Sequence, residues 1–187
     1  MRRGIVVSRC CAGRAGNLFL RERVKCRAAL LLTLASAYVA SMRRHSGSVR
    51  GSLTVSDDLR VEGSVDAHVI VRARRRLIVT GALMGVLVIE PDATVAILGA
   101  FGALVQENLG LLLVAGIIKG RPWERMPGRF AVASGSTIIH NGHWVLGPEG
   151  HLDRLEGAEV GSVRPSEDFL EFKAGTWVPA ELSDVGL

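Results

Sequence analysis

Residues 59–67 read Leu-Arg-Val-Glu-Gly-Ser-Val-Asp-Ala, and three further copies of this pattern follow along the chain. The copies are Leu-Ile-Val-Thr-Gly-Ala-Leu-Met-Gly at 77–85, Val-Ala-Ile-Leu-Gly-Ala-Phe-Gly-Ala at 95–103 and Leu-Leu-Val-Ala-Gly-Ile-Ile-Lys-Gly at 112–120. Their central glycines lie 18, 18 and 17 residues apart. A regular period of this size indicates a solenoid, in which each copy is one coil that buries its apolar face only by stacking on its neighbours.

Within each coil, large apolar residues alternate with polar or small ones, which is the two-residue period of a strand. We therefore expect an all-β fold: a short β-solenoid (β-helix) of about four coils with about three strands in each. Glycines are expected at the corners, where the chain needs a positive φ or room for the next coil's backbone. The expected core stack, through whose ends the chain would self-associate, comprises Leu59, Leu77, Val95, Leu112, Val65, Leu83, Phe101 and Ile118.

The positive charge of the chain is confined to its first part. Residues 1–50 hold 11 Lys or Arg against one acid, whereas residues 51–187 hold 12 against 17, so the body is net acidic. An acidic body repels phosphate, and we expect no nucleic-acid partner. Aromatic residues are scarce at 5%, which suits a stack of Val, Leu, Ile and Ala.

Residues 1–46 form a basic arm that contains a 13-residue apolar run at 28–40. Such a run is too short to span a bilayer, which takes about 20 residues. It is a signal-peptide core, a membrane-surface helix or an ordinary packed helix, unless translation begins further along the chain. The three cysteines, Cys10, Cys11 and Cys26, all lie in this arm, so no disulfide or thiolate metal site is expected in the fold.

The repeat resembles that of the bactofilins, bacterial polymer-forming cytoskeletal proteins built on a short β-helix. The likeness rests on residues 59–67, 79–85 and 114–120 and covers about 47–120. It implies filaments that form without nucleotide, a scaffold role beside a membrane, and no catalysis. A six-residue period in the same text is also typical of hexapeptide acyltransferases, a weaker alternative that would rely on His68, the histidine inside the coils.

Two features interrupt the repeat. Four arginines, Arg72, Arg74, Arg75 and Arg76, lie between coils and would contact an anionic group or form a solvated corner. Glu107 falls where other coils have an aliphatic residue. Because an isolated buried carboxylate is costly, we expect this side to bulge outward.

Residues 121–187 form a C-terminal module in which two hairpins are expected. Asn141 and Gly142 separate two apolar runs within 137–146, a strong hairpin signal, and the second hairpin is expected at 169–178. His140 and His143 flank the first turn, as a metal pair or as exposed residues. The large aromatics of the module form a small core, or else Trp144 and Trp177 contact a partner.

No catalytic triad, phosphate loop or metal cluster occurs at a usable spacing, so we expect neither an enzyme nor a cofactor. The first hypothesis is a structural scaffold that self-associates into oligomers or filaments, cytoplasmic, with its arm at a membrane surface; export through a signal peptide is the alternative location. The second is a capped, monomeric binding module for a protein or glycan. The state of the coil ends separates these two hypotheses.

Overall fold

The computed structural model describes residues 42–124, 126, 128–156 and 165–182. The chain divides into two units, residues 1–40 and 41–187. The first unit, which includes most of the basic arm and all three cysteines, lies outside the described residues. No helix of the described part is long and apolar enough to cross a membrane.

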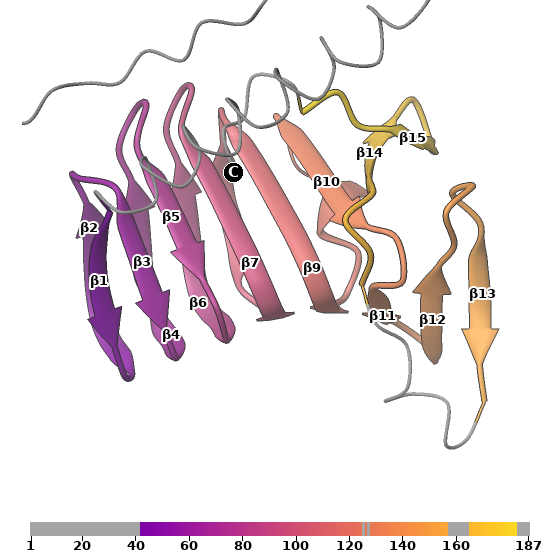
Figure 1. Cartoon of the computed structure of the whole chain (residues 1–187), viewed down its shortest axis with the longest axis horizontal. Coiled ribbons are helices and arrows are strands. Elements are labelled where there is room, and N and C mark those ends of the chain that lie inside the picture. The colour runs from indigo at the N-terminus through magenta and orange to yellow at the C-terminus, as the bar shows by residue number, and fades with distance from the viewer. Residues whose placement is uncertain (1–41, 125, 127, 157–164, 183–187) are drawn as a thin grey trace, which may run out of the picture. The chain divides into compact units, whose positions relative to one another are not determined.

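The described part is an all-β structure whose centre is a β-solenoid of about five turns, as the repeat predicts (Figure 1). Neighbouring turns pair in parallel, and Leu59, Leu77, Val95 and Leu112 lie opposite one another in successive strands. Val65, Leu83, Phe101 and Ile118 form a second column in the same way. The strands of the first turns are β1 (Arg43–Ser46), β2 (Val49–Val55), β3 (Leu59–Glu62), β4 (Ser64–Val71), β5 (Arg76–Val79), β6 (Ala82–Ile89), β7 (Thr94–Phe101), β8 (Leu104–Asn108) and β9 (Leu111–Lys119).

The glycines of the repeat form a column at one corner of the coil. A Cβ added at Gly63, Gly81, Gly99 or Gly116 would lie 2.0–2.3 Å from the carbonyl oxygen of the glycine one turn earlier. Gly81 and Gly99 need no positive φ, so at these positions the close approach of two turns alone excludes a side chain. The expectation that corner glycines make room for the next backbone is confirmed.

The solenoid continues beyond the last glycine of the repeat. Two short strands, β10 (Arg129–Ala133) and β11 (Thr137–Ile139), both pair in parallel with β9 and complete a further turn. At the other end, β1 pairs in parallel with β3. Parallel pairing therefore runs from residue 43 to residue 139, past both limits of the segment 47–120, and this accounts for about five turns in place of four.

Both expected hairpins are confirmed. The strand β12 (His143–Leu146) pairs antiparallel with β11 across Asn141 and Gly142, whose φ values of 50° and 128° are positive. The strands β14 (Phe169–Lys173) and β15 (Thr176–Pro179) are likewise antiparallel. β13 (Leu152–Leu155) extends the first hairpin, and β14 pairs antiparallel with β10. A 3-10 turn, η1 (Pro122–Glu124), follows β9.

The bulge expected near Glu107 is also confirmed. The register between β6 and β8 shifts at Gln106, so that Glu107 is exposed and Asn108 lies opposite Ile89. Asn108 is fully buried, where its amide nitrogen donates to the Arg129 carbonyl (3.1 Å) and its amide oxygen accepts from the Gly110 N–H (3.2 Å). Because of the bulge, the buried position opposite Ile89 is taken by the amide of Asn108, which bridges two turns, and the Glu107 carboxylate stays outside.

Candidate functional site

The N-terminal end of the solenoid is open among the described residues. β1 and β2 each pair with one strand only, β3 and β4 respectively, so their outer edges lack a partner in the described part of the chain. Beside them is a pocket of about 370 Å³ that Leu53, Val55 and Leu59 help to line. Leu53 and Leu59 remain half-buried, whereas the residues opposite them in the next turn, Val69 and Leu77, are fully covered.

The first turn carries polar groups where inner turns carry apolar ones. Arg43 lies opposite Leu59, and His45 lies opposite Val61 in the register of β1 and β3. Both are exposed, and Arg43 approaches Asp57 at 3.9 Å. The open end therefore presents an apolar floor, formed by Leu53, Val55 and Leu59, which the basic residues Arg43 and His45 border.

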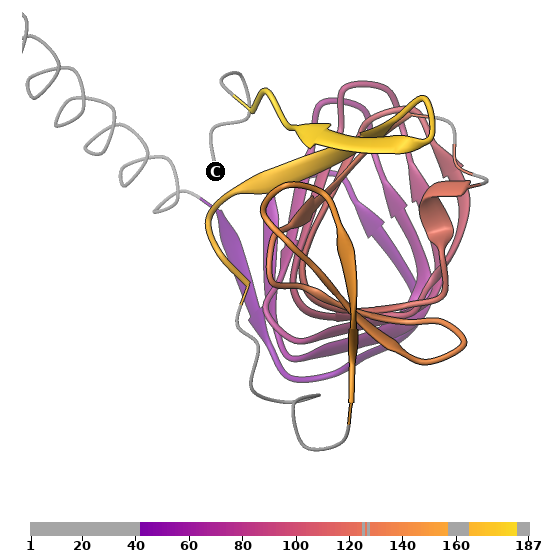
Figure 2. The same ribbon diagram turned by 90° about the vertical axis from the view of Figure 1, so that its right-hand side faces the viewer.

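The C-terminal end is closed by aromatic side chains. Trp123 stacks on Phe130 with ring centroids 5.8 Å apart, and Trp177 meets Trp123 and Phe172 edge-on at 5.2 Å. Trp177 is 8% exposed, so the β14–β15 hairpin carries it into the core as a lid on the last turn. Figure 2 looks onto this end, with β14 and β15 lying across the outline of the coil.

An ion pair with a buried carboxylate holds that hairpin to the last turn. Glu171 on β14, whose side chain is 3% exposed, accepts two hydrogen bonds of 3.1 Å from Arg129 on β10 and forms an ion pair with Lys173 at 3.1 Å. Burial alone would raise the pKa of Glu171. The hydrogen bonds from Arg129 and Lys173 outweigh burial, and the pKa is lowered below its usual value.

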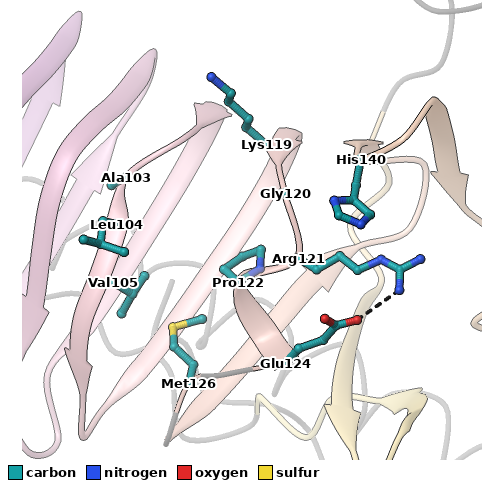
Figure 3. A pocket seen from close by; sticks show the side chains of 10 residues that line it. All are labelled: Ala103, Leu104, Val105, Lys119, Gly120, Arg121, Pro122, Glu124, Met126 and His140. Atoms are coloured by element: carbon teal, nitrogen blue, oxygen red, sulfur yellow. Dashed lines mark hydrogen bonds and ion pairs between the residues drawn. The ribbon is translucent and has the colours of Figure 1, made fainter.

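A groove lies beside β8, where the solenoid lacks one strand. In the turn after β8, the segment that would continue this side of the coil is η1, so β8 pairs with β6 alone among the described strands. The pocket at this edge measures about 340 Å³, and Leu104 and Val105 line one side of it while Pro122 and Met126 line the other (Figure 3). Leu104 is 69% exposed, the most exposed large apolar side chain of the described part.

The arginine run of the corner 72–76 pairs with acids of the next turn. Arg72 forms an ion pair with Glu90 at 2.6 Å, and Arg74 approaches Asp92 at 3.8 Å. The hydrogen bonds from Arg72 and from the Ala73 N–H lower the pKa of Glu90. Arg75 is exposed and Arg76 is half-buried at the start of β5. Acids thus neutralise part of the run, which reduces its attraction for an external anion.

The remaining sequence candidates, all within the described residues, do not form a metal site. Trp144 is half-buried, and its indole N–H donates to the His140 carbonyl at 3.0 Å. His143 lies opposite Ile139 rather than His140, and His68 is an exposed residue of β4. Within the described ranges, no three His, Cys, Asp or Glu side chains are grouped closely enough to hold a metal ion.

The open edge of β8 and the polar first turn were not predicted from the sequence. Two features of the sequence could have indicated them. The aliphatic pattern of the repeat is missing at 121–124, and basic residues stand at 43–45. Comparison with protein-family models, with curated proteins and with solved structures found no match to this chain.

Proposed function

We propose that this protein is a non-enzymatic scaffold that self-associates through the open N-terminal end of its β-solenoid. The observation that carries the proposal is the difference between the two ends. Aromatic rings and a hairpin close the C-terminal end, whereas the edges of β1 and β2 and the apolar residues beneath them stay uncovered in the described part.

The occupant that fits this end is a second copy of the chain. Edge strands with free N–H and C=O groups pair readily with other strands, and the half-buried Leu53 and Leu59 would lose their remaining contact with water. A head-to-tail chain needs two complementary ends, and the C-terminal one is closed. The proposal is therefore a two-fold pair joined end to end, in which each copy offers the same surface.

Two other hypotheses have less support in the geometry. A binding module that uses Trp177 would have to expose a ring that is packed among Trp123 and Phe172. An acyltransferase relative would need His68 in a pocket, and His68 is an exposed strand residue that lines neither of the two pockets described above.

Sedimentation velocity of the full chain, from about 1 to 100 µM, tests the proposal. We expect a monomer–dimer equilibrium that shifts toward dimer as concentration rises. Thr54→Lys adds charge at an exposed position of the open end, and Leu53→Glu adds it to the apolar floor, so both should favour monomer. Ile117→Glu, at an exposed position of β9, is the matched control and should leave the equilibrium unchanged.

Full-length protein that stays monomeric across this range would refute the proposal, as would equal loss of dimer in the Ile117→Glu control. Changes in the middle of the stack cannot serve as tests. Leu77 and Val95 are fully buried between turns, so an aspartate there would unfold the solenoid whatever its state of association.

A further inference from the structure

We propose that the open edge of β8 binds an extended peptide segment that adds a strand to the solenoid. The segment has apolar residues at its centre, an acidic residue at one end and a basic residue at the other. This site is separate from the N-terminal end and does not depend on self-association.

The first argument is the vacant backbone edge. In a parallel ladder, the N–H and C=O groups of a strand point to both of its neighbours, and β8 has a paired strand only on the β6 side among the described residues, although Arg129 contacts Asn108 at its end. No backbone hydrogen bond joins Leu104 or Val105 to η1 in the described chain. An added strand is the ligand that satisfies such an edge, and main-chain hydrogen bonds supply its affinity.

The second argument is the apolar groove that runs along the same edge. Leu104 and Val105 face Pro122 and Met126 across the pocket of about 340 Å³ (Figure 3). An incoming strand would therefore cover the 69% exposed Leu104 and place an apolar side chain in the groove. The bulge at Gln106 bends the edge, which limits the pairing to a short segment.

The third argument is the charge at the two ends of the edge. Lys119 lies at the rim of the groove beside Gly102, just before β8, and Glu107 lies near the end of β8. Both are exposed, and neither has an ion-pair partner in the described part of the chain. Arg121 is already paired with Glu124 at 3.0 Å. A ligand with its acid over Lys119 and its base over Glu107 complements this pattern.

Fluorescence anisotropy with two labelled hexapeptides and the full-length protein tests the proposal. One probe is Asp-Thr-Val-Thr-Val-Lys and the other is Lys-Thr-Val-Thr-Val-Asp, both with blocked termini, and they fit a parallel and an antiparallel strand respectively. Because the contact is smaller than a standard protein interface, we expect one of them to bind with a dissociation constant of about 10–100 µM. The same probe with alternate backbone amides N-methylated should not bind.

Variants of the protein locate the site. Leu104→Glu should weaken binding about tenfold or more, while Leu98→Glu, at a 47% exposed position of β7, should change it less than about twofold. Lys119→Glu should weaken binding, and a probe with lysine in place of its aspartate should restore it. Hydrogen exchange should slow at residues 103–105 in the bound state.

The proposal is overturned if neither probe binds below about 1 mM, or if the N-methylated probe binds as well as the unmodified one. Equal effects of Leu104→Glu and Leu98→Glu would also overturn it. Both variants change exposed side chains, so a circular dichroism spectrum like that of the unchanged protein is expected for each.

Discussion

The substitution Gly99→Ala tests the close stacking of the turns at the glycine corner. The added Cβ would lie 2.1 Å from the Gly81 carbonyl oxygen, and that atom would have to move by about 0.9 Å to reach the 3.0 Å that real Cβ contacts keep. The same oxygen accepts a hydrogen bond of 2.8 Å from the Ala100 N–H. A movement of this size therefore weakens a backbone hydrogen bond between two turns.

The magnitude follows from these two effects. Overpacking a tightly packed site costs about 1–3 kcal/mol, and a buried hydrogen bond that is lost costs about 1–3 kcal/mol. The lower entropy of the unfolded alanine chain returns about 0.4–1 kcal/mol. With the midpoint of each range, we expect a net loss of about 3 kcal/mol in the free energy of unfolding, or roughly 6–12 °C in Tm for a domain of this size.

The assay is equilibrium urea unfolding followed by far-ultraviolet circular dichroism, because this signal reports on strands of every turn. Gly120→Ala is the control: its φ of 82° is strained for alanine, yet the added Cβ would meet no atom within 4 Å. It should cost only about 1 kcal/mol. Equal losses in the two variants would show that strain at φ, and not contact between turns, accounts for the glycines, and would refute the reasoning.

Two further changes address the closed end and the bulge. The pKa of Glu171 is lower in the folded chain than in the unfolded one, so its carboxylate stabilises the fold fully above the unfolded value near 4.3, and this contribution is lost as pH falls through the folded pKa. Glu171→Gln should therefore lower the free energy of unfolding near neutral pH and approach the unchanged protein in acid; urea titrations at several pH values check this, and a difference that grows in acid would contradict it. Asn108→Ala should cost about 2–3 kcal/mol, because it removes the hydrogen bonds that the Asn108 amide forms with the Arg129 carbonyl and the Gly110 N–H; a loss below about 0.5 kcal/mol in the same assay would mean that the amide is not a bridge between turns.

Much of the fold could be predicted because the repeat encodes the register directly. Gly81 and Gly99 are 18 residues apart, and this distance is one turn of the coil, so each large apolar residue finds its partner in the next turn. The Asn141–Gly142 turn could also be predicted, because it depends only on adjacent residues: positive φ at two successive residues suits a tight hairpin. Glu107 indicated the bulge, because an unpaired carboxylate is not tolerated in the core.

The last turn could not be predicted in the same way. η1 replaces a strand after β9 and alters the spacing, so that Ser136, whose hydroxyl accepts a hydrogen bond from the Gly116 N–H at 3.2 Å, follows that glycine by 20 residues. From the sequence, Trp177 could be interpreted either as a core residue or as a residue that contacts a partner. Its burial depends on β14 pairing with β10, a contact between segments distant in the chain.

By itself, the sequence determined the coil, its register and its corners, because these depend on residues one turn apart. Only the tertiary structure decided which end is closed and which edge is open. An end or an edge is defined by what lies beside it in space. The vacancy next to β8 arises because Pro122–Glu124 turns where a strand would run, and the closure of the last turn arises because a hairpin some 40 residues further along returns to it.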